Sequence, residues 1–243
     1  MLNLFGLIFF SILFTVIIII FRKFIAEKVN IFDYPNENRK IHKKPTPLIG
    51  GIVIIFNLIL VNLYLVLSNQ ITNLDILILI FCITSFFTGL VDDINKISSI
   101  KKLILIGIAY IFIGLFNENF FLKYLYSETF NKFYYLNILN IFFTVLCVLL
   151  LVNAFNLSDG INSLAIIISI IWLSYIFVYF KNINFSYVII IISLIIMLPF
   201  NFKGKFFLGD SGSLMLGSFI GVLFVTNYNQ EIDFQNNKIS FES

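Results

Sequence analysis

Two adjacent carboxylates, Asp92 and Asp93, end the run of residues 86–91 and are the first side chains whose placement suggests chemistry. Ionisable groups at the edge of an apolar segment are costly to bury and usually serve a function. Neighbouring carboxylates repel each other, so one that loses its water needs a proton or a cation. A divalent cation or one of the three lysines between 96 and 102 would supply that charge. The alternative is a solvated carboxylate pair at a helix end.

A second polar stretch, residues 209–213 (GDSGS), precedes an apolar run that starts at Leu214. Two glycines beside one aspartate permit a close backbone approach. A helix that begins here would offer free N–H groups and a positive dipole end to a phosphate. Asp210 could then hold Mg²⁺, which binds one or two carboxylates together with phosphate oxygens and water. The alternative is a capped turn with Ser211 or Ser213 as the N-cap.

A third stretch places three amides and a carboxylate between two apolar runs: Asn153, Asn156, Asp159 and Asn162. Amides are expensive in such a place unless they bind something. Asparagine suits a nucleobase edge, a sugar hydroxyl or a metal ion. Helix capping by Asn156 or Asp159 is the alternative.

A fourth stretch is a basic loop over residues 39–47, which contains Arg39, Lys40 and the single histidine of the chain, His42. Its positive charges could bind phosphate groups of a substrate. The alternative is an anchor that touches anionic lipid headgroups.

These four stretches sit in a chain whose composition is typical of membrane proteins. Of the 243 residues, 60% are hydrophobic and only 12% are charged, with a net charge of +3 and a mean hydropathy of +1.00. A soluble domain averages about 25% charged residues. So few charges cannot cover a soluble globule, and lipid is the solvent that fits.

The apolar runs predict an all-α, polytopic transmembrane helix bundle of about eight spans in a single integral membrane domain, 1–243. The predicted spans are 3–21, 48–68, 75–91, 103–117, 136–152, 161–180, 185–200 and 214–228. Helices are expected because the runs are too long and too continuously apolar for barrel strands.

The basic residues predict which side of the membrane each loop faces. Loops 22–47, 92–102, 153–160 and 201–213 carry twelve lysines and arginines, and the opposite side carries four. This bias predicts that the first set is cytoplasmic and that the N-terminus is outside. All four polar stretches then lie on the cytoplasmic face and predict one composite site there. Carboxylates, basic groups and amides at that face suit phosphoryl transfer to a membrane-held acceptor.

Together, the four stretches resemble the polyprenyl-phosphate N-acetylhexosamine-1-phosphate transferase superfamily (glycosyltransferase family 4). The chain is similar to undecaprenyl-phosphate GlcNAc-1-phosphate transferases and, through them, to phospho-MurNAc-pentapeptide transferases. The resemblance covers about residues 30 to 220. The matching motifs are Asp33-x-Pro35, Arg39-Lys40-x-His42, Pro47-x-x-Gly50-Gly51, Asp92-Asp93, Asn153-x-x-Asn156-x-x-Asp159-Gly160 and Phe207 through Ser213. The basic loop favours the enzymes that initiate cell-envelope polysaccharides, such as lipopolysaccharide, over the peptidoglycan branch.

The resemblance implies an Mg²⁺-dependent transfer of a sugar 1-phosphate from a UDP-sugar to undecaprenyl phosphate, with release of UMP; Mn²⁺ is the alternative cation. Asp92 and Asp93 would be catalytic, and Asp210 with Asn156 would bind the metal. The implied substrate-binding residues are Asn153, Asp159, Asn162, Lys40, His42 and Arg39. The implied location is the inner membrane of a bacterium, with membrane lipid as a partner, no nucleic acid, and a homodimer as one open oligomeric state.

Two other interpretations stay open from the sequence. One is a transporter or a protein that binds anionic lipid headgroups without chemistry, although a transporter should place polar groups near the bilayer midplane. The other is an inactive paralogue or a fragment. Members of the family usually continue with further spans and a His- and Arg-rich loop, so the chain is expected to be truncated at its C-terminus and slow or inactive alone.

Overall fold

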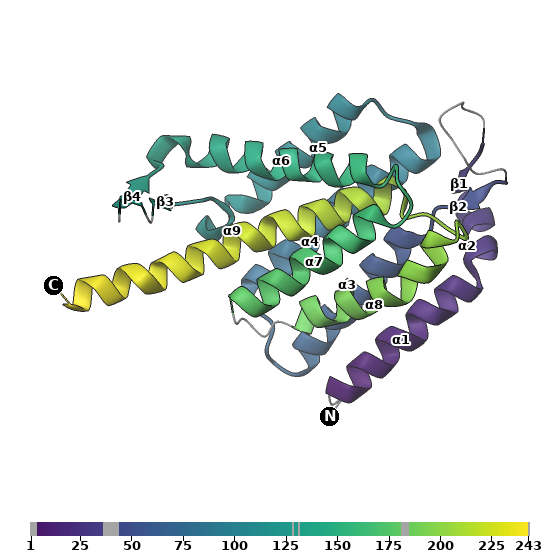
Figure 1. The fold of residues 1–243 in the computed structure, drawn as a ribbon, viewed down its shortest axis with the longest axis horizontal. Helices are drawn as coiled ribbons and strands as arrows, with labels where there is room; N and C mark the ends of the chain where they lie inside the picture. Colours follow the sequence, from purple (N-terminus) through teal and green to yellow (C-terminus); the bar gives the residue numbers. More distant parts are fainter. Residues whose placement is uncertain (1–3, 36–43, 128, 131, 181–184, 243) are drawn as a thin grey trace.

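A bundle of helices accounts for nearly all of the chain in the computed structural model, which describes residues 4–35, 44–127, 129–130, 132–180 and 185–242 (Figure 1). The helices of these residues are α1 (Leu4–Ile20), α2 (Arg22–Val29), α3 (Gly50–Leu67), α4 (Asn73–Asn95), α5 (Ser99–Gly114), α6 (Asn140–Ser158), α7 (Leu164–Tyr179), α8 (Phe185–Phe202) and α9 (Gly209–Glu242). Two short 3₁₀ helices, Glu118–Phe120 and Asn137–Leu139, complete the helical elements of this part of the chain.

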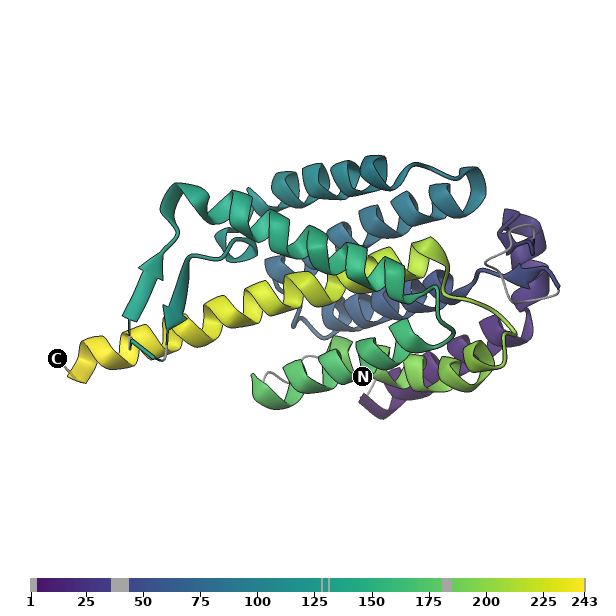
Figure 2. The same ribbon diagram turned by 45° about the horizontal axis from the view of Figure 1, so that its top comes forward.

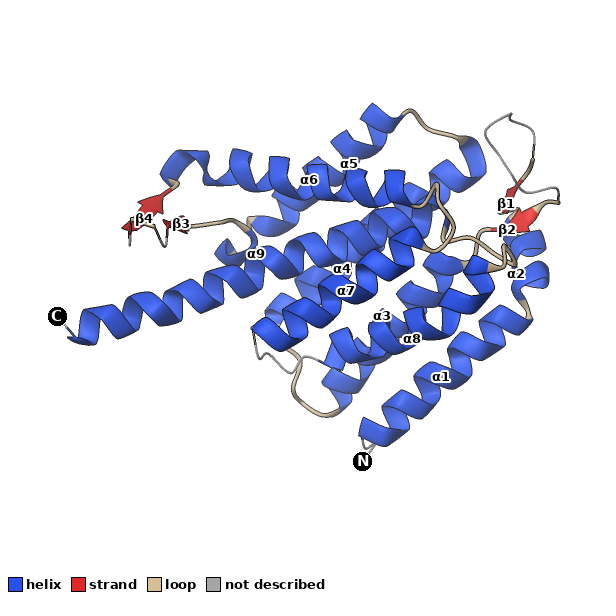
Figure 3. Cartoon of the chain, in the orientation of Figure 1, coloured by secondary structure: helices blue, strands red, loops and turns tan. Residues whose placement is uncertain are grey.

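Two antiparallel strand pairs lie at opposite ends of the bundle (Figure 3). The first pairs β1 (Phe32–Asp33) with β2 (Thr46–Pro47), and the second pairs β3 (Tyr124–Ser127) with β4 (Lys132–Tyr135). Because they are so short, they do not change the fold class, and the predicted all-α bundle is confirmed.

Each of the eight predicted apolar segments coincides with one of the long helices. Five stretches are long and apolar enough to cross a membrane: Gly50–Leu67, Asn73–Asn95, Asn137–Ser158, Phe185–Phe202 and Gly209–Asp233. A sixth is obtained if α1 and α2, which meet at a bend of 70°, form one span. The chain is therefore a multi-pass membrane protein, while the count of eight and the side of the N-terminus stay predictions.

Helix α9 is the central element, and it packs against α3, α4, α6 and α7 (Figure 2). Gly217 and Gly221, four residues apart, face α6, where an added Cβ would lie 2.8 Å from the Val152 backbone and 3.3 Å from Val148. Small residues at this spacing let two helices approach closely inside a membrane, where packing replaces the hydrophobic effect as the driving force. Sequence analysis ended this helix near residue 228, but it continues to Glu242.

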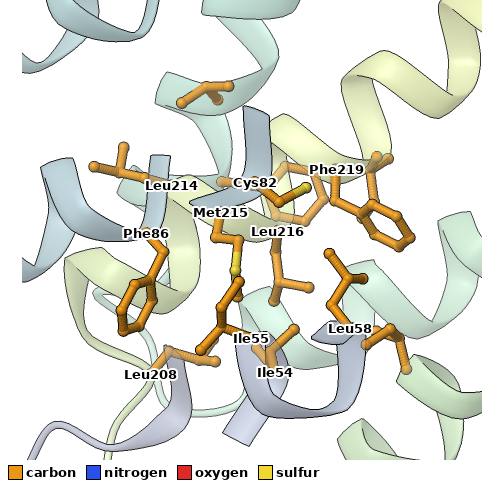
Figure 4. Packing of buried hydrophobic residues seen from close by; sticks show 14 of the residues in the cluster. Ile54, Ile55, Leu58, Cys82, Phe86, Leu208, Leu214, Met215, Leu216 and Phe219 are labelled. Carbon is orange, nitrogen blue, oxygen red and sulfur yellow. The ribbon is translucent and has the colours of Figure 1, made fainter. Parts of the chain in front are cut away.

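The apolar core lies where α3, α4 and α9 meet (Figure 4). Leu58 of α3, Cys82 of α4 and Met215 of α9 are all at most 2% exposed. This packing fixes the first turn of α9 relative to the last turns of α4. It thereby positions the polar groups at that end of the bundle.

The segment before α9 joins the N-terminal end of α3 through the backbone. The N–H groups of Gly50 and Gly51 donate to the carbonyl oxygens of Phe207 and Leu208, each at 3.1 Å. These bonds satisfy the otherwise unpaired N–H groups of a helix N-terminus. A Cβ on Gly51 would lie 2.7 Å from the backbone nitrogen of Gly212, so the glycines of two separate motifs permit this contact.

Gly89 provides the corresponding close contact between α4 and α9. A Cβ at this position would lie 2.4 Å from the backbone of Asp210 and Ser211. We expect Gly89→Ala to lower the free energy of unfolding by about 1–3 kcal/mol, the usual cost of overpacking. Thermal unfolding in detergent, followed by the fluorescence of Trp172, measures the change.

The matched control is Gly107→Ala in α5. Its new Cβ would approach only side-chain atoms, those of Leu149 at 3.2 Å and of Val145 at 3.9 Å. Alanine is also the better helix former, so this variant should keep the unfolding temperature of the parent chain or exceed it. Equal losses in the two variants would contradict the proposed contact between α4 and α9.

Candidate active site at the N-terminus of α9

Two carboxylates from other elements cap the first turn of α9. Asp93, at the end of α4, accepts hydrogen bonds from the backbone N–H groups of Asp210 and Ser211, at 2.8 and 3.1 Å. Asp159, the residue after α6, lies close to the N–H group of Gly209, which acts to lower the pKa of its carboxyl. Gly209 has a φ of +74°, which favours glycine. The two bonds to Asp93 satisfy two otherwise unpaired donors at the N-terminus of the helix.

This arrangement corrects one sequence-based prediction. We expected the N–H groups at the start of this helix to receive a phosphate, or Ser211 or Ser213 to cap them. Instead, the carboxylate of Asp93 holds the N–H groups of Asp210 and Ser211. A phosphate would therefore have to bind beside the helix end, at the side chains, rather than on these backbone groups.

Lys102, in the first turns of α5, joins two of the remaining carboxylates. Its ammonium donates to Asp92 at 2.9 Å and also contacts the carboxylate of Asp210. The Lys102 side chain is only 8% exposed. Asp92 is held from its other oxygen by the backbone N–H of Ile97. One carboxylate from α4 and one from α9 therefore share the buried ammonium of Lys102.

Asn156, in the last turn of α6, contacts the other oxygen of Asp210. Its amide nitrogen donates to Asp210 at 3.0 Å and to the hydroxyl oxygen of Ser213 at 3.1 Å. Asparagine side chains can present either their nitrogen or their oxygen with little change of shape. The amide oxygen could therefore replace the nitrogen beside Asp210 if a cation were bound there.

The site is crowded with negative charge. Burial, followed by the nearby carboxylates of Asp210 and Asp93, raises the pKa of Asp159 to about 8. Asp33 of β1 contributes in the same direction. Carboxyl groups that are this close favour a proton or a cation among them.

The structure brings together five of the sequence-predicted site residues: Asp92, Asp93, Asn156, Asp159 and Asp210. Asn153 is half-buried one turn earlier on α6, and Asn162 is exposed in the turn before α7. Among the described residues, neither side chain hydrogen-bonds to the carboxylates. Arg39, Lys40 and His42 lie outside the described residues.

Two features of the site were not identified from the sequence. Lys102 was one of three candidate counter-cations, and its burial distinguishes it from its exposed neighbour Lys101. Helical periodicity offered a signal, since Lys102 is on the same face as the buried Ile106 and Tyr110. The capping role of Asp93 had no signal of its own, because its partners lie more than a hundred residues away.

The residues of the site fit a hard divalent cation that takes only a few of its ligands from the protein. Within the ranges that the structure describes, no group of three or more His, Cys, Asp or Glu side chains is arranged to hold a metal. Mg²⁺ does not need such a cage, because it binds one or two carboxylates and takes its other ligands from phosphates and water. Asp210, together with Asn156 and Asp92, offers this smaller donor set.

A membrane helix bundle with a buried acidic cluster at one end is the class of protein that the fold and the site define. Comparison with known families places it more narrowly. The model of glycosyl transferase family 4 matches residues 75–227, which contain the whole cluster. The chain belongs to this family.

Similar proteins come from two branches of the family. The chain is 31% identical over 239 residues to a phospho-N-acetylmuramoyl-pentapeptide-transferase of Campylobacter jejuni, which covers 82% of this chain and 65% of the relative. It is 33% identical over 211 residues to a probable undecaprenyl-phosphate N-acetylglucosaminyl 1-phosphate transferase of Bacillus subtilis, which covers 83% and 56%. The chain thus spans roughly two thirds or less of the length of these curated relatives. Which branch it belongs to stays a prediction.

Proposed function

We propose that this protein transfers a sugar 1-phosphate, of the N-acetylhexosamine class, from a UDP-sugar to undecaprenyl phosphate and releases UMP. The observation that carries the proposal is the convergence of Asp92, Asp210 and Asn156 from three helices on one point at the end of a membrane bundle. Membership in glycosyl transferase family 4 supports the same reaction class.

The location of the cluster suits a reaction between a lipid-held acceptor and a soluble donor. The carboxylates lie at the ends of apolar helices, where the phosphate of a membrane lipid would reside. We propose Mg²⁺, with Mn²⁺ as a substitute, bound through Asp210 and Asn156. When bound, the cation would neutralise and orient the donor diphosphate.

The chain's own residues would divide the remaining work. Asp92, whose side chain is 13% exposed, is the candidate to position the acceptor phosphate or take its proton. Asp93 and Asp159 would hold the first turn of α9, and with it Asp210, in place. Positioning of this kind supplies much of the rate in phosphoryl transfer.

The activity can be tested directly with the purified chain. It is incubated in detergent with undecaprenyl phosphate, Mg²⁺ and a panel of UDP-N-acetylhexosamines, and UMP release is measured. We expect at most slow release, as for a truncated chain, and we expect that release to require both the lipid and the divalent cation. If no donor supports UMP release, or if release does not depend on the lipid phosphate, this chain is not such a transferase by itself.

A second prediction concerns the side of the membrane. We propose that the site faces the cytoplasm of a bacterial inner membrane, as the bias of basic residues indicates. In a variant without Cys82 and Cys147, Lys101→Cys should resist an impermeant thiol reagent added to spheroplasts. Gln70→Cys, in the loop between α3 and α4 at the opposite end, should react.

Both test positions are exposed in the structure, so burial does not explain a difference between them. Labelling after permeabilisation confirms that each cysteine is reactive. If the cysteine at position 101 is labelled from outside, the proposed orientation is wrong.

A further inference from the structure

Lys102 has an unusual environment for a lysine. Its side chain is 8% exposed, although it lies at the start of a helix beside Lys101, which is exposed. Lysine is almost never buried unless it is paired. Here the ammonium contacts two carboxylates from different helices, Asp92 of α4 and Asp210 of α9.

The ammonium lies between the two carboxylates that a divalent cation bridging α4 and α9 would need. Asp210 has two carboxylate oxygens, of which one faces Lys102 and the other faces the amide of Asn156. The second ligand candidate, Asp92, uses one oxygen for Lys102 and the other for the backbone N–H of Ile97. A metal ion that bridges Asp92 and Asp210 would therefore have to replace the lysine.

The charges of the site also indicate that a metal ion between Asp92 and Asp210 would have to replace the lysine. Two desolvated carboxylates this close repel each other unless a cation lies between them. An ammonium neutralises one charge and a divalent ion neutralises two, but both cannot sit between the same two oxygens. The lysine and the metal are therefore alternatives, and each lowers the affinity of the site for the other.

We propose that Lys102 is a resident counter-cation that holds the metal position between Asp92 and Asp210 and is displaced when a divalent cation binds. This inference rests on the divalent cation of the proposed function and adds Asp92 to Asp210 and Asn156 as a ligand of that cation. Because Lys102 competes for this position, it weakens the affinity of the site for the metal. The metal then binds well only when another anion, such as a phosphate, receives the displaced ammonium.

The test measures metal affinity without turnover. The 243-residue chain in detergent is titrated with Mn²⁺, and free Mn²⁺ is followed by electron paramagnetic resonance. We expect Lys102→Met to bind Mn²⁺ roughly ten- to a hundredfold more tightly than the parent chain, the range expected from losing a close charge competitor. Lys101→Met removes the same charge from the exposed neighbouring position and should change the dissociation constant by less than about threefold.

Folding is controlled in two ways. Each variant is checked by size-exclusion chromatography and by the fluorescence of Trp172. If Lys102→Met does not fold, Lys102→Gln replaces it, because its amide can still donate to one of the carboxylates. The increase in Mn²⁺ affinity caused by Lys102→Gln should again exceed the increase caused by Lys101→Gln.

The outcomes separate this inference from the proposed function. If the parent chain and Lys102→Met bind Mn²⁺ with equal affinity, or if Lys102→Met binds it more weakly, the displacement is refuted while the metal site stands. If none of the variants binds Mn²⁺, the metal site fails and the displacement fails with it. Tight binding that survives in an Asp210→Asn, Lys102→Met double variant would place the metal elsewhere and also overturn the inference.

Discussion

Replacing Asp210 with asparagine is expected to lower the rate of UMP release by about 10²- to 10³-fold, the usual cost of removing one electrostatic contact to a transition state. The carboxylate of Asp210 is the point where Lys102 and Asn156 meet, so it is the strongest candidate to bind a cation. An amide lacks the charge that a hard cation prefers. The rate at saturating Mg²⁺ and the Mn²⁺ dissociation constant are the two measurements.

The substitution should not unfold the chain. An asparagine at position 210 can still accept a hydrogen bond from Lys102 through its single amide oxygen, and its amide nitrogen can donate to Asn156 once that side chain turns its own oxygen toward it. The backbone bonds to Asp93 do not depend on the side chain. The control is Glu118→Gln, which removes one negative charge from a side chain that is 82% exposed at the other end of the bundle. If both variants keep the parent rate, Asp210 is not a metal ligand or a catalytic group.

The sequence was sufficient to predict the helices because lipid imposes a simple rule. A segment that crosses a membrane must satisfy its own backbone hydrogen bonds and present apolar side chains. The eight apolar runs therefore marked the eight long helices that the structure contains at those positions. The bend between α1 and α2 was not predicted, because it falls between an apolar run and a basic segment that hydropathy treats as a loop.

The extension of α9 escaped prediction for a different reason. After residue 228 the sequence becomes polar, and polar sequence next to a span was interpreted as a tail. In the structure, this helix continues past the bundle beside the β3–β4 hairpin (Figure 1). Asn229 donates to the carbonyl oxygens of Asn119 and Phe121, and Lys123 pairs with Asp233 at 3.6 Å. Its polar residues here serve contacts that hydropathy does not measure.

Residue types predicted the members of the site better than their roles. Asp92, Asp93, Asp159 and Asp210 were selected as ionisable groups at the ends of apolar runs, and all four lie together. Which carboxylate contacts a cation and which contacts a helix end depends on the packing of α4 against α9. That packing relies on Gly89 and on contacts between segments about 120 residues apart, which a single sequence does not reveal.

Asp93 accepts hydrogen bonds from the backbone of α9, whereas Asp92 contacts Lys102, and this difference leads to the second large predicted effect. We expect Asp93→Ala to lower the free energy of unfolding by about 2–4 kcal/mol, because two backbone N–H groups of α9 lose their acceptor in a buried place. The rate of UMP release should fall as well, since the first turn of α9 carries Asp210. Thermal unfolding in detergent and the rate of UMP release are measured on the same preparation.

Asp75→Ala is the matched control, because Asp75 also uses its carboxylate at a helix N-terminus. It forms a capping box with Thr72 at the start of α4, at the opposite end from the site. Its loss should cost about 1 kcal/mol and leave the rate unchanged. If Asp93→Ala instead keeps the unfolding temperature of the parent chain but loses UMP release, Asp93 acts on the reacting groups themselves. The sequence-based assignment of a catalytic role to Asp93 would then be preferred over the capping role that its hydrogen bonds indicate.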